Sequence, residues 1–451
     1  MNLQRTNDKS ILPGAGSIVH VVGIAGVGMN AVAQLLQARG YRVTGSDRLK
    51  DQRAPSSPVL DVLERGGIRI FPQDGSGITP ETGAVVISSA IEPDNPDLES
   101  ARTHEVPGYH RAEALAAVIG DDRCIAVAGT SGKTTVTGMV GWVLAEAGLD
   151  PNVVNGGAVL NWKTKDRVGN VRMGASDLWV VEVDESDRSL LQFHPEWALI
   201  TNISRDHFDL KETVDLFGGF AEQVTRGLIC GQGVHRHLAG MKKIKAPQWD
   251  APADTGRLLV PSLPGKHNQE NALLACALCE QLGLSRAEAA QALARFKGIE
   301  RRLERVGTCR DVTVYDDYAH NPAKIHAAWS AVSEKAERVL GMWRPHGFGP
   351  LAAMADDLVA MFRDTCRSGD RLYMLPVYYA GGTANKAVTS DMLVDRLRAA
   401  DVPACAVAGY DELANLLLRE SRAGDVVLCM GARDPQLPIF ARDLVSRLAA
   451  D

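Results

Sequence analysis

The sequence has no long apolar run, no excess of basic residues and no second pair of closely spaced cysteines. No apolar stretch approaches the roughly 18–20 residues needed to cross a bilayer, and residues 1–16 lack the apolar core of a signal peptide. The net charge of −6 gives no electrostatic case for a nucleic-acid partner. We therefore expect a cytoplasmic protein that neither inserts into a membrane nor binds nucleic acid.

Eight cysteines are scattered along the chain, mostly in apolar runs, as is typical of small core residues in a reducing compartment. Cys276 and Cys279 form a CxxC inside a helical pattern. We interpret this pair as structural, with a metal or redox role as the alternative.

The chain of 451 residues is long enough for two or three domains, and 45% apolar with 23% charged residues is typical of a globular protein. Short apolar runs alternate with helical patterns, which favours an α/β fold. Turn-like residues at 120–122 and at 297–298 predict domain boundaries. We expect domains at residues 1–119, 120–297 and 298–451, with an irregular polar stretch at 231–264.

The most informative motif is a loop that carries a lysine between an apolar run at 124–128 and a helical pattern at 136–147. Its residues are Gly129, Thr130, Ser131, Gly132, Lys133, Thr134 and Thr135. A glycine-bearing loop between strand and helix directs backbone N–H groups at an anion, and a hydroxyl after the lysine can bind Mg²⁺. Val127 replaces the first glycine of the strict nucleotide-loop pattern. The alternative is an ordinary turn with an exposed lysine.

A second glycine loop follows the β-branched run at 18–22, where Gly23, Gly26 and Gly28 form GxxGxG. The usual dinucleotide pattern is GxGxxG, so this loop is a weak signal. A further strand at 41–45 ends at Ser46-Asp47, where an acid could bind a ribose. NAD, a nucleotide-sugar diphosphate and close helix–strand packing all remain open for this Rossmann-like opening.

Polar side chains follow several other predicted strands. The four acids in residues 182–187 end one strand, and residues 202–209, which include His207, follow the next. At the carboxyl end of a strand these side chains favour a hard cation over a solvated turn. Asn268 opens a helix and could be its N-cap or an adenine ligand. Residues 315–322 end a strand of the third domain, and their acids could face a ribose or a phosphate-linked metal.

Taken in this order, the motifs resemble the Mur ligase family, the ATP-dependent amide ligases of peptidoglycan synthesis. The matching residues span nearly the whole chain: 23–29, 45–47, 88–91, 95–96, 129–135, 182–187, 201–209, 267–271, 298–302 and 316–322. Within the family, the GSD, EVDESD and TNI…DH patterns are similar to the branch that joins UDP-N-acetylmuramate to L-alanine. They are also similar to a related branch that reattaches a recycled tripeptide.

The resemblance implies a monomeric or weakly dimeric enzyme of three domains that uses ATP and Mg²⁺. A Rossmann-like N-terminal domain would bind UDP-N-acetylmuramate, and a central P-loop-type ATPase domain with a parallel sheet would bind ATP. A C-terminal Rossmann-like α/β domain would bind a small amino acid. The muramyl carboxylate would take the γ-phosphoryl group, and the amine would then displace phosphate from the acyl phosphate.

The resemblance also implies roles for individual residues. UDP-sugar binding is implied for Gly23, Gly26, Val27, Gly28, Met29, Asp47 and Ser89. ATP binding is implied for Gly129, Thr130, Ser131, Gly132, Lys133, Thr134, Thr135, Asn268, Asn271, Arg302 and Asp317. The implied metal ligands are Thr134, Glu182 and His207, the catalytic residues Lys133, Glu182 and His207, and the amine-binding residues His320 and His346.

Three features depart from the family pattern. Lys211 lies too close to the DH motif to be the carbamylated lysine of some members, which agrees with the alanine-adding branch. Only 56 residues separate Asp209 from Lys266, so we expect the central domain to lack peripheral strands. The arginines that normally follow His346 are replaced by Gly347 and Pro350.

Because an amino acid's carboxylate needs a cationic partner, this last change leaves the amine open. Lys386 or Arg433 could substitute for the missing arginines. Two other hypotheses are a nucleotide-dependent oxidoreductase built on the first glycine loop and a non-catalytic protein that retains the fold.

Overall fold

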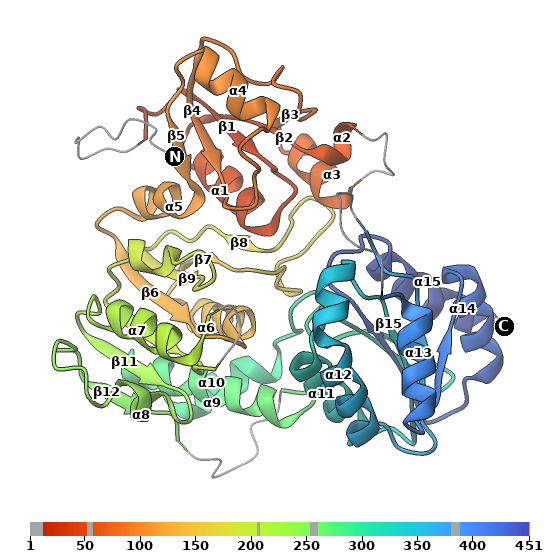
Figure 1. Cartoon of the computed structure of the whole chain (residues 1–451). Coiled ribbons are helices and arrows are strands. Elements are labelled where there is room, and N and C mark those ends of the chain that lie inside the picture. Colours follow the sequence, from red (N-terminus) through yellow and green to blue (C-terminus); the bar gives the residue numbers. More distant parts are fainter. Residues whose placement is uncertain (1–11, 52–56, 205–207, 253–259, 380–387, 451) are drawn as a thin grey trace. The chain divides into compact units, whose positions relative to one another are not determined.

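The computed structural model describes residues 12–51, 57–204, 208–252, 260–379 and 388–450 (Figure 1). The chain divides into two compact units, and each is described by itself. One comprises Met1–Leu259 and Glu270–Lys297, and the other Val260–Gln269 and Gly298–Asp451. None of the helices in the described ranges is long and apolar enough to cross a bilayer.

The first unit begins with a parallel sheet in the strand order β3-β2-β1-β4-β5. Its elements are β1 (Ile18–Val22), α1 (Val27–Ala38), β2 (Arg42–Ser46), α2 (Arg48–Asp51), α3 (Pro58–Arg65), β3 (Arg69–Phe71), β4 (Thr82–Ile87), α4 (Pro96–Thr103), β5 (Gly108–His110) and α5 (Arg111–Ile119). The order reverses between β1 and β4, which is where doubly wound sheets bind ligands. The Rossmann-like prediction is confirmed, and the first glycine loop lies at this reversal.

Local sequence explains where the helices of this sheet begin. Asn95 caps α4 by accepting a hydrogen bond from the backbone N–H of Asp97, and Pro96 supplies the first helical residue. At α5 the His110 side chain accepts from Ala112 N, and Glu113 accepts from His110 N at 2.9 Å. This capping box fixes the direction of α5 and therefore of Arg111, its first residue.

The same unit contains a second sheet in the order β12-β11-β10-β6-β9-β7-β8, in which only the β7–β8 pair is antiparallel. Its elements are β6 (Arg123–Ala128), α6 (Lys133–Glu146), β7 (Asn152–Val154), β8 (Val171–Arg172), β9 (Leu178–Glu182), a 3₁₀ turn (Ser189–Gln192), β10 (Trp197–Ile200), α7 (Leu210–Ala221), β11 (Gly227–Cys230), α8 (Val234–Leu238), β12 (Gln248–Asp250), α9 (Lys266–Gln281) and α10 (Arg286–Ala294). The first turn of α9, up to Gln269, is assigned to the other unit. The prediction of an irregular stretch at 231–264 is wrong where α8 and β12 lie. These elements are too short to give a periodic pattern.

The second unit is built on the sheet β13-β14-β18-β15-β16-β17. Its elements are β13 (Glu304–Cys309), β14 (Val312–Asp317), α11 (Pro322–Ser333), β15 (Arg338–Trp343), α12 (Phe348–Thr365), β16 (Arg371–Met374), α13 (Ser390–Ala399), β17 (Ala404–Ala406), α14 (Tyr410–Glu420), β18 (Asp425–Met430) and α15 (Leu437–Ala450). All neighbours are parallel except the β13–β14 hairpin, which the sequence analysis missed.

Helices cover both faces of this third sheet, as the blue part of Figure 1 shows. Side chains of α11, α12 and α13, including Trp329 and Leu358, form one buried core. Side chains of α14 and α15, including Leu417 and Phe440, form the other. With both faces covered, the strands are continuous apolar runs, which is why the sequence revealed them.

The cysteines in the described ranges are free thiols. Cys276 and Cys279 are fully buried in α9, and burial raises the pKa of Cys276 to about 11. The pKa of Cys279 is raised further for the same reason. A thiol that resists ionisation is a poor metal ligand or redox centre. The burial of both thiols therefore favours the structural interpretation of the CxxC pair.

Candidate active site

The lysine loop connects β6 to α6 in the middle of the second sheet. Gly129 and Gly132 have φ angles of +131° and +84°, which only glycine adopts readily. The chain after β10 holds the loop: Asn202 accepts hydrogen bonds from the N–H groups of Thr130 and Ser131, both at 3.1 Å. The Thr201 hydroxyl donates to Ser131 O at 2.6 Å. The predicted strand–loop–helix arrangement is therefore present, and neighbouring strands shape it.

The alternative of an exposed lysine is wrong, because Lys133 is largely buried, and phosphate binding by the loop remains a prediction. The Lys133 side chain is 14% exposed, and Nζ lies 2.5 Å from Glu185 Oε2 and 2.8 Å from Gly129 O. Glu185 is buried. Burial raises the pKa of this carboxyl, while the Lys133 charge opposes the rise. The loop lysine therefore has a carboxylate partner that an anion would have to replace or share.

Thr134 and Glu182 form a pair of oxygen donors beside the loop. The Thr134 hydroxyl donates to Glu182 Oε1 at 2.9 Å, and Gly156 N donates to Glu182 Oε2 at 2.6 Å. These two predicted metal ligands are thus brought together although 48 residues separate them. His207, the third, lies outside the described residues. In the described ranges no group of three His, Cys, Asp or Glu side chains forms a metal-binding cluster.

Arg111 links the acidic run to the first glycine loop, and the sequence analysis did not find it. Its Nη2 lies 2.9 Å from Asp187 Oδ2 and 3.5 Å from Asp184 Oδ2. A Cβ placed on Gly28 would lie 3.3 Å from Arg111 Nη1. Burial alone would raise the pKa of Asp187, but hydrogen bonds from Ser189 and the Arg111 charge lower it. The two phosphate-binding candidates are therefore joined by charged side chains in one compact unit.

The first glycine loop lies against the chain that follows β4. A Cβ on Gly23 would lie 3.4 Å from Ile91 Cδ1. Ser89 and Val27 are exposed at this edge, whereas Met29 is buried in the core. Gly26 precedes α1 and donates its N–H to Gly23 O at 3.0 Å. Of the residues expected to contact a UDP-sugar, Gly26, Val27 and Ser89 are therefore exposed, and Gly23 and Gly28 are partly exposed.

Asp47 is buried and serves the loop itself. Its carboxylate accepts hydrogen bonds from Ala25 N at 2.8 Å and from Leu49 N at 3.0 Å. These bonds fix the glycine loop relative to the end of β2. A ribose contact for Asp47 remains a prediction, and its observed function is to shape the loop.

Asn271 of α9 reaches the lysine loop. A Cβ on Gly132 would lie 2.7 Å from Asn271 Oδ1. Asn268 lies in the first turn of α9, which begins at Lys266, and its amide donates to Pro264 O at 2.8 Å. The N-cap alternative for Asn268 is therefore wrong. Its contact with adenine remains a prediction.

In the second unit, Asp317 is the last residue of β14, and Arg302 lies just before β13. The Asp317 carboxylate accepts from Leu303 N at 2.6 Å and from Ala319 N at 2.7 Å. Burial raises the pKa of Asp317, and the Arg302 charge opposes this. The Arg302 guanidinium lies over the Tyr318 ring, 5.3 Å from its centroid. Both residues stiffen the turn, and their contacts with a nucleotide remain predictions.

The neighbouring Asp316 is 1% exposed, and burial raises its pKa to about 7, although Arg301 Nε lies 3.3 Å away. A carboxyl whose folded pKa exceeds its unfolded value of 3.8 destabilises the fold once ionised, so stability falls as the pH rises toward 7. Between pH 5 and pH 8, ionisation of Asp316 should lower the free energy of unfolding of the wild type by roughly 2–3 kcal/mol. We expect Asp316→Asn to lack this decrease. The measurement is the free energy of unfolding of the unit that contains Asp316, obtained from urea unfolding at both pH values.

The control for this variant is Asp395→Asn, whose carboxylate is 79% exposed. We expect its unfolding free energy to follow the wild-type pH dependence. An Asp316→Asn protein with that same dependence would contradict the raised pKa.

His320 and His346, the predicted amine-binding residues, lie together. Their rings pack edge to face with centroids 5.5 Å apart, although they follow different strands, β14 and β15. His320 Nδ1 is 3.0 Å from Tyr318 O. Their juxtaposition agrees with a shared site, and the amine contact remains a prediction.

Next to His346 is a polar cluster that the sequence analysis missed. Arg344 Nη1 lies 2.5 Å from Asp434 Oδ2, and the Tyr410 hydroxyl donates to the same oxygen at 2.5 Å. The Arg344 guanidinium also lies over the rings of Tyr378 and Tyr410. Because 90 residues separate Arg344 from Asp434, no local signal could have revealed the pair.

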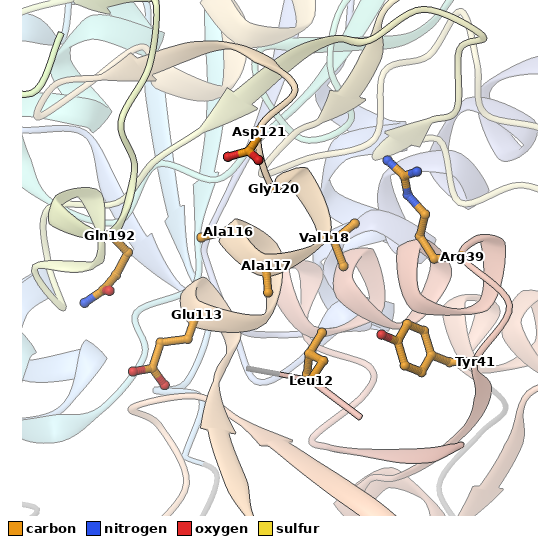
Figure 2. A pocket seen from close by; sticks show the side chains of 10 residues that line it. All are labelled: Leu12, Arg39, Tyr41, Glu113, Ala116, Ala117, Val118, Gly120, Asp121 and Gln192. Atoms are coloured by element: carbon orange, nitrogen blue, oxygen red, sulfur yellow. The ribbon is translucent and has the colours of Figure 1, made fainter. Parts of the chain in front are cut away.

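A cavity of about 460 Å³ lies elsewhere, around the second half of α5. Figure 2 shows the side chains of Arg39, Tyr41, Asp121 and Gln192 around that helix. None of the predicted site residues lines it. The cavity is therefore separate from both glycine loops.

Comparisons with known proteins agree with these motifs. Residues 18–123 match the family model described as Mur ligase family, catalytic domain. Residues 127–216 match the Mur ligase middle domain, and residues 301–433 match the Mur ligase, glutamate ligase domain. The order of the three matches follows the order of the three sheets.

Curated relatives resemble the chain over nearly its whole length. A UDP-N-acetylmuramate–L-alanine ligase of a Synechococcus strain is 35% identical, covering 94% of this chain and 91% of that protein. The Cereibacter sphaeroides protein of the same name is 34% identical, and the match covers 98% of this chain and 99% of that protein.

Among solved structures, a UDP-N-acetylmuramate–alanine ligase from Thermotoga maritima has a TM-score of 0.77 at 24% identity, covering 96% of this chain and 99% of that one. A murein peptide ligase from Psychrobacter arcticus has a TM-score of 0.66 at 22% identity, and the match covers 97% of this chain and 99% of that one. At these identities the likeness shows the fold alone.

The three parallel-dominated sheets with their covering helices define an α/β protein with a lysine loop and a separate glycine loop. The chain belongs to the Mur ligase family.

Proposed function

We propose that this protein is an ATP-dependent ligase that joins the carboxylate of UDP-N-acetylmuramate to L-alanine, in peptidoglycan precursor synthesis. Family membership and relatives named for this activity support it. The observation that carries the proposal is the chain of charged contacts in the first unit. It runs from Lys133 and Glu185 through the acidic run to Arg111 beside Gly28. This arrangement supports a common charged centre between the two loops that we propose bind the two nucleotides.

The proposed reaction has two steps. A carboxylate is a poor acyl donor at neutral pH, so its oxygen first attacks the γ-phosphorus of ATP and ADP departs. The amine nitrogen then attacks the acyl carbon, loses a proton, and displaces phosphate. Lys133 would neutralise charge on the transferring oxygens, and the loop N–H groups would orient the triphosphate.

The residues present fit a divalent cation. The Thr134 hydroxyl and the Glu182 carboxylate are hard oxygen donors 2.9 Å apart beside the loop. Mg²⁺ held there, with His207 as a further proposed ligand, would offset the negative charge of the phosphates. The backbone helps to position the Glu182 carboxylate, since Gly156 N donates a hydrogen bond to its second oxygen.

We assign the substrates to domains as the resemblance implies. Residues 1–119 would bind UDP-N-acetylmuramate, residues 120–297 ATP, and residues 298–451 the amine through His320 and His346. We propose a cytoplasmic location and a monomeric or weakly dimeric state. Size-exclusion chromatography with light scattering tests the latter.

Phosphate release from purified protein, ATP, Mg²⁺ and UDP-N-acetylmuramate, with single amines added in turn, tests the reaction. L-Alanine should stimulate release. The main alternative is attachment of a recycled L-Ala-D-Glu-diaminopimelate tripeptide, which Gly347 and Pro350 in place of arginines keep open. Release that only the tripeptide stimulates would refute the alanine assignment. Nicotinamide-dependent absorbance changes would instead support the oxidoreductase hypothesis, and ATP binding without any stimulated release would support a non-catalytic protein.

The close packing of Gly129 makes a further prediction. A methyl group added there would clash with Thr201 Oγ1 and lie 2.9 Å from Thr201 N, at a φ that disfavours alanine. We expect Gly129→Ala to lose the rise in melting temperature that ATP and Mg²⁺ give the wild type. In the Gly240→Ala control, where the Cβ meets open space, the rise should persist. An undiminished rise in Gly129→Ala would contradict the loop assignment.

A further inference from the structure

The loops that follow four strands of the third sheet meet at one edge. β14, β18, β15 and β16 are neighbours and parallel, so their carboxyl ends point the same way. His320 follows β14, Arg433 follows β18, and His346 follows β15. The strand that carries Arg433 thus lies between the two that carry the histidines.

The backbone on both sides of Arg433 is held firmly. Gly431 donates its N–H to Asp317 O at 3.2 Å, and Arg301 donates to Gly431 O and, at 3.0 Å, to Ala432 O. On the other side the buried Asp434 carboxylate accepts from Arg344, Tyr410 and, at 2.9 Å, Gln436 N. The peptide that bears Arg433 is therefore preorganised.

The side chain of Arg433, in contrast, is exposed and makes no ion pair with any residue in the described ranges. Burial and then the Arg433 charge lower the pKa of His346, so Arg433 lies within electrostatic reach of that histidine. A cation presented on a fixed loop beside His346 can bind an anion without first losing a partner.

Two arginines that contact the residues next to Arg433 are occupied. The Arg344 guanidinium is neutralised by Asp434 and covered by two tyrosine rings. Arg301 is used by two backbone carbonyls and Asp316. Positions 347 and 350 hold glycine and proline, which carry no charge.

We propose that Arg433 binds the carboxylate of the incoming amine and thereby selects α-amino acids or peptides with a free carboxylate. This inference rests on the proposed ligase function and extends it. The position differs from the segment directly after His346, where the sequence lacks arginine. Arg433 acts as a specificity-determining residue, with Arg301 and Asp434 as positioning residues that hold its loop.

Steady-state phosphate release with L-alanine as the varied substrate tests the proposal. We expect Arg433→Ala to raise the KM for L-alanine by about tenfold or more, as for loss of a charge-assisted hydrogen bond. The kcat and the KM for ATP should change less than about threefold. Arg433→Lys keeps the charge, so its KM for L-alanine should lie between those of the wild type and Arg433→Ala. The matched control is Arg419→Ala, because Arg419 is exposed on α14 and forms no ion pair within the described ranges. Its KM for L-alanine should equal that of the wild type.

A second measurement compares L-alanine with L-alaninamide, which lacks the carboxylate charge. The wild type should prefer L-alanine, and Arg433→Ala should lose most of that preference. Wild-type discrimination retained in Arg433→Ala, together with an unchanged KM, would overturn the assignment of Arg433 alone. Absence of amine-stimulated phosphate release by the wild type would instead refute the proposed function. Because Arg433 is exposed, its variants should melt at the wild-type temperature.

Discussion

Lys133→Ala should lower the turnover number of the ligation by at least about 10²-fold, the usual cost of losing a charge that stabilises a transition state. Lys133 is the cation of the loop, and its Nζ is fixed between Gly129 O and Glu185 at the start of α6. In the proposed reaction the same amine would meet the transferring phosphoryl oxygens. The measurement is phosphate release at saturating ATP, UDP-N-acetylmuramate and L-alanine.

The variant also leaves the buried Glu185 without its cation, which destabilises a fold by roughly 3–5 kcal/mol unless the carboxyl takes up a proton. Low turnover could then reflect unfolding. The double variant Lys133→Ala with Glu185→Gln removes the unpaired charge, so it should regain stability in urea unfolding but not turnover. Lys243→Ala, an exposed lysine of the same unit, is the control. Near-normal turnover in the double variant would count against the mechanism.

The second large effect is expected for Glu182→Gln. This change keeps the size of the side chain but replaces one of the two carboxylate oxygens with an amide nitrogen. In the wild type, Oε1 accepts from the Thr134 hydroxyl and Oε2 from Gly156 N. If Glu182 holds Mg²⁺, turnover should fall by at least about 10²-fold and the Mg²⁺ concentration for half-maximal rate should rise. Phosphate release measured across a Mg²⁺ titration gives both quantities.

Glu222→Gln is the matched control for that titration, because Glu222 is exposed at the end of α7 in the same unit. It should leave the Mg²⁺ dependence unchanged. A Glu182→Gln enzyme with the wild-type Mg²⁺ requirement would remove Glu182 from the metal site, even if its turnover were low.

Local patterns predicted most of the fold. The runs at β1, β6, β9 and β18 are buried on both sides, so their apolar residues are continuous and easily recognised. The edge strands β12 and β13 were missed. They are short or half exposed, with burial that varies along the strand, so they lack both a continuous run and a strict alternation.

The candidate site was predicted unevenly for the same reason. Lys133, Thr134 and the glycines lie within one loop, whose spacing alone indicates phosphate binding. Arg111 and Asp434 carry no such signal, since each acts through a partner 76 or 90 residues away. Asp47 and Asn268 were assigned to ligands, but in the structure both bond to backbone groups of their own neighbourhoods.

The sequence by itself determined the family, the three α/β sheets and the lysine loop, because glycine spacing and apolar runs act within a few residues. Only the tertiary structure decided which charges meet. It paired Lys133 with Glu185, set Arg111 between Gly28 and Asp187, and neutralised Arg344 with Asp434 while leaving Arg433 exposed. An ion pair depends on distances of a few ångströms between side chains, and those distances are set by strand order rather than by separation along the chain.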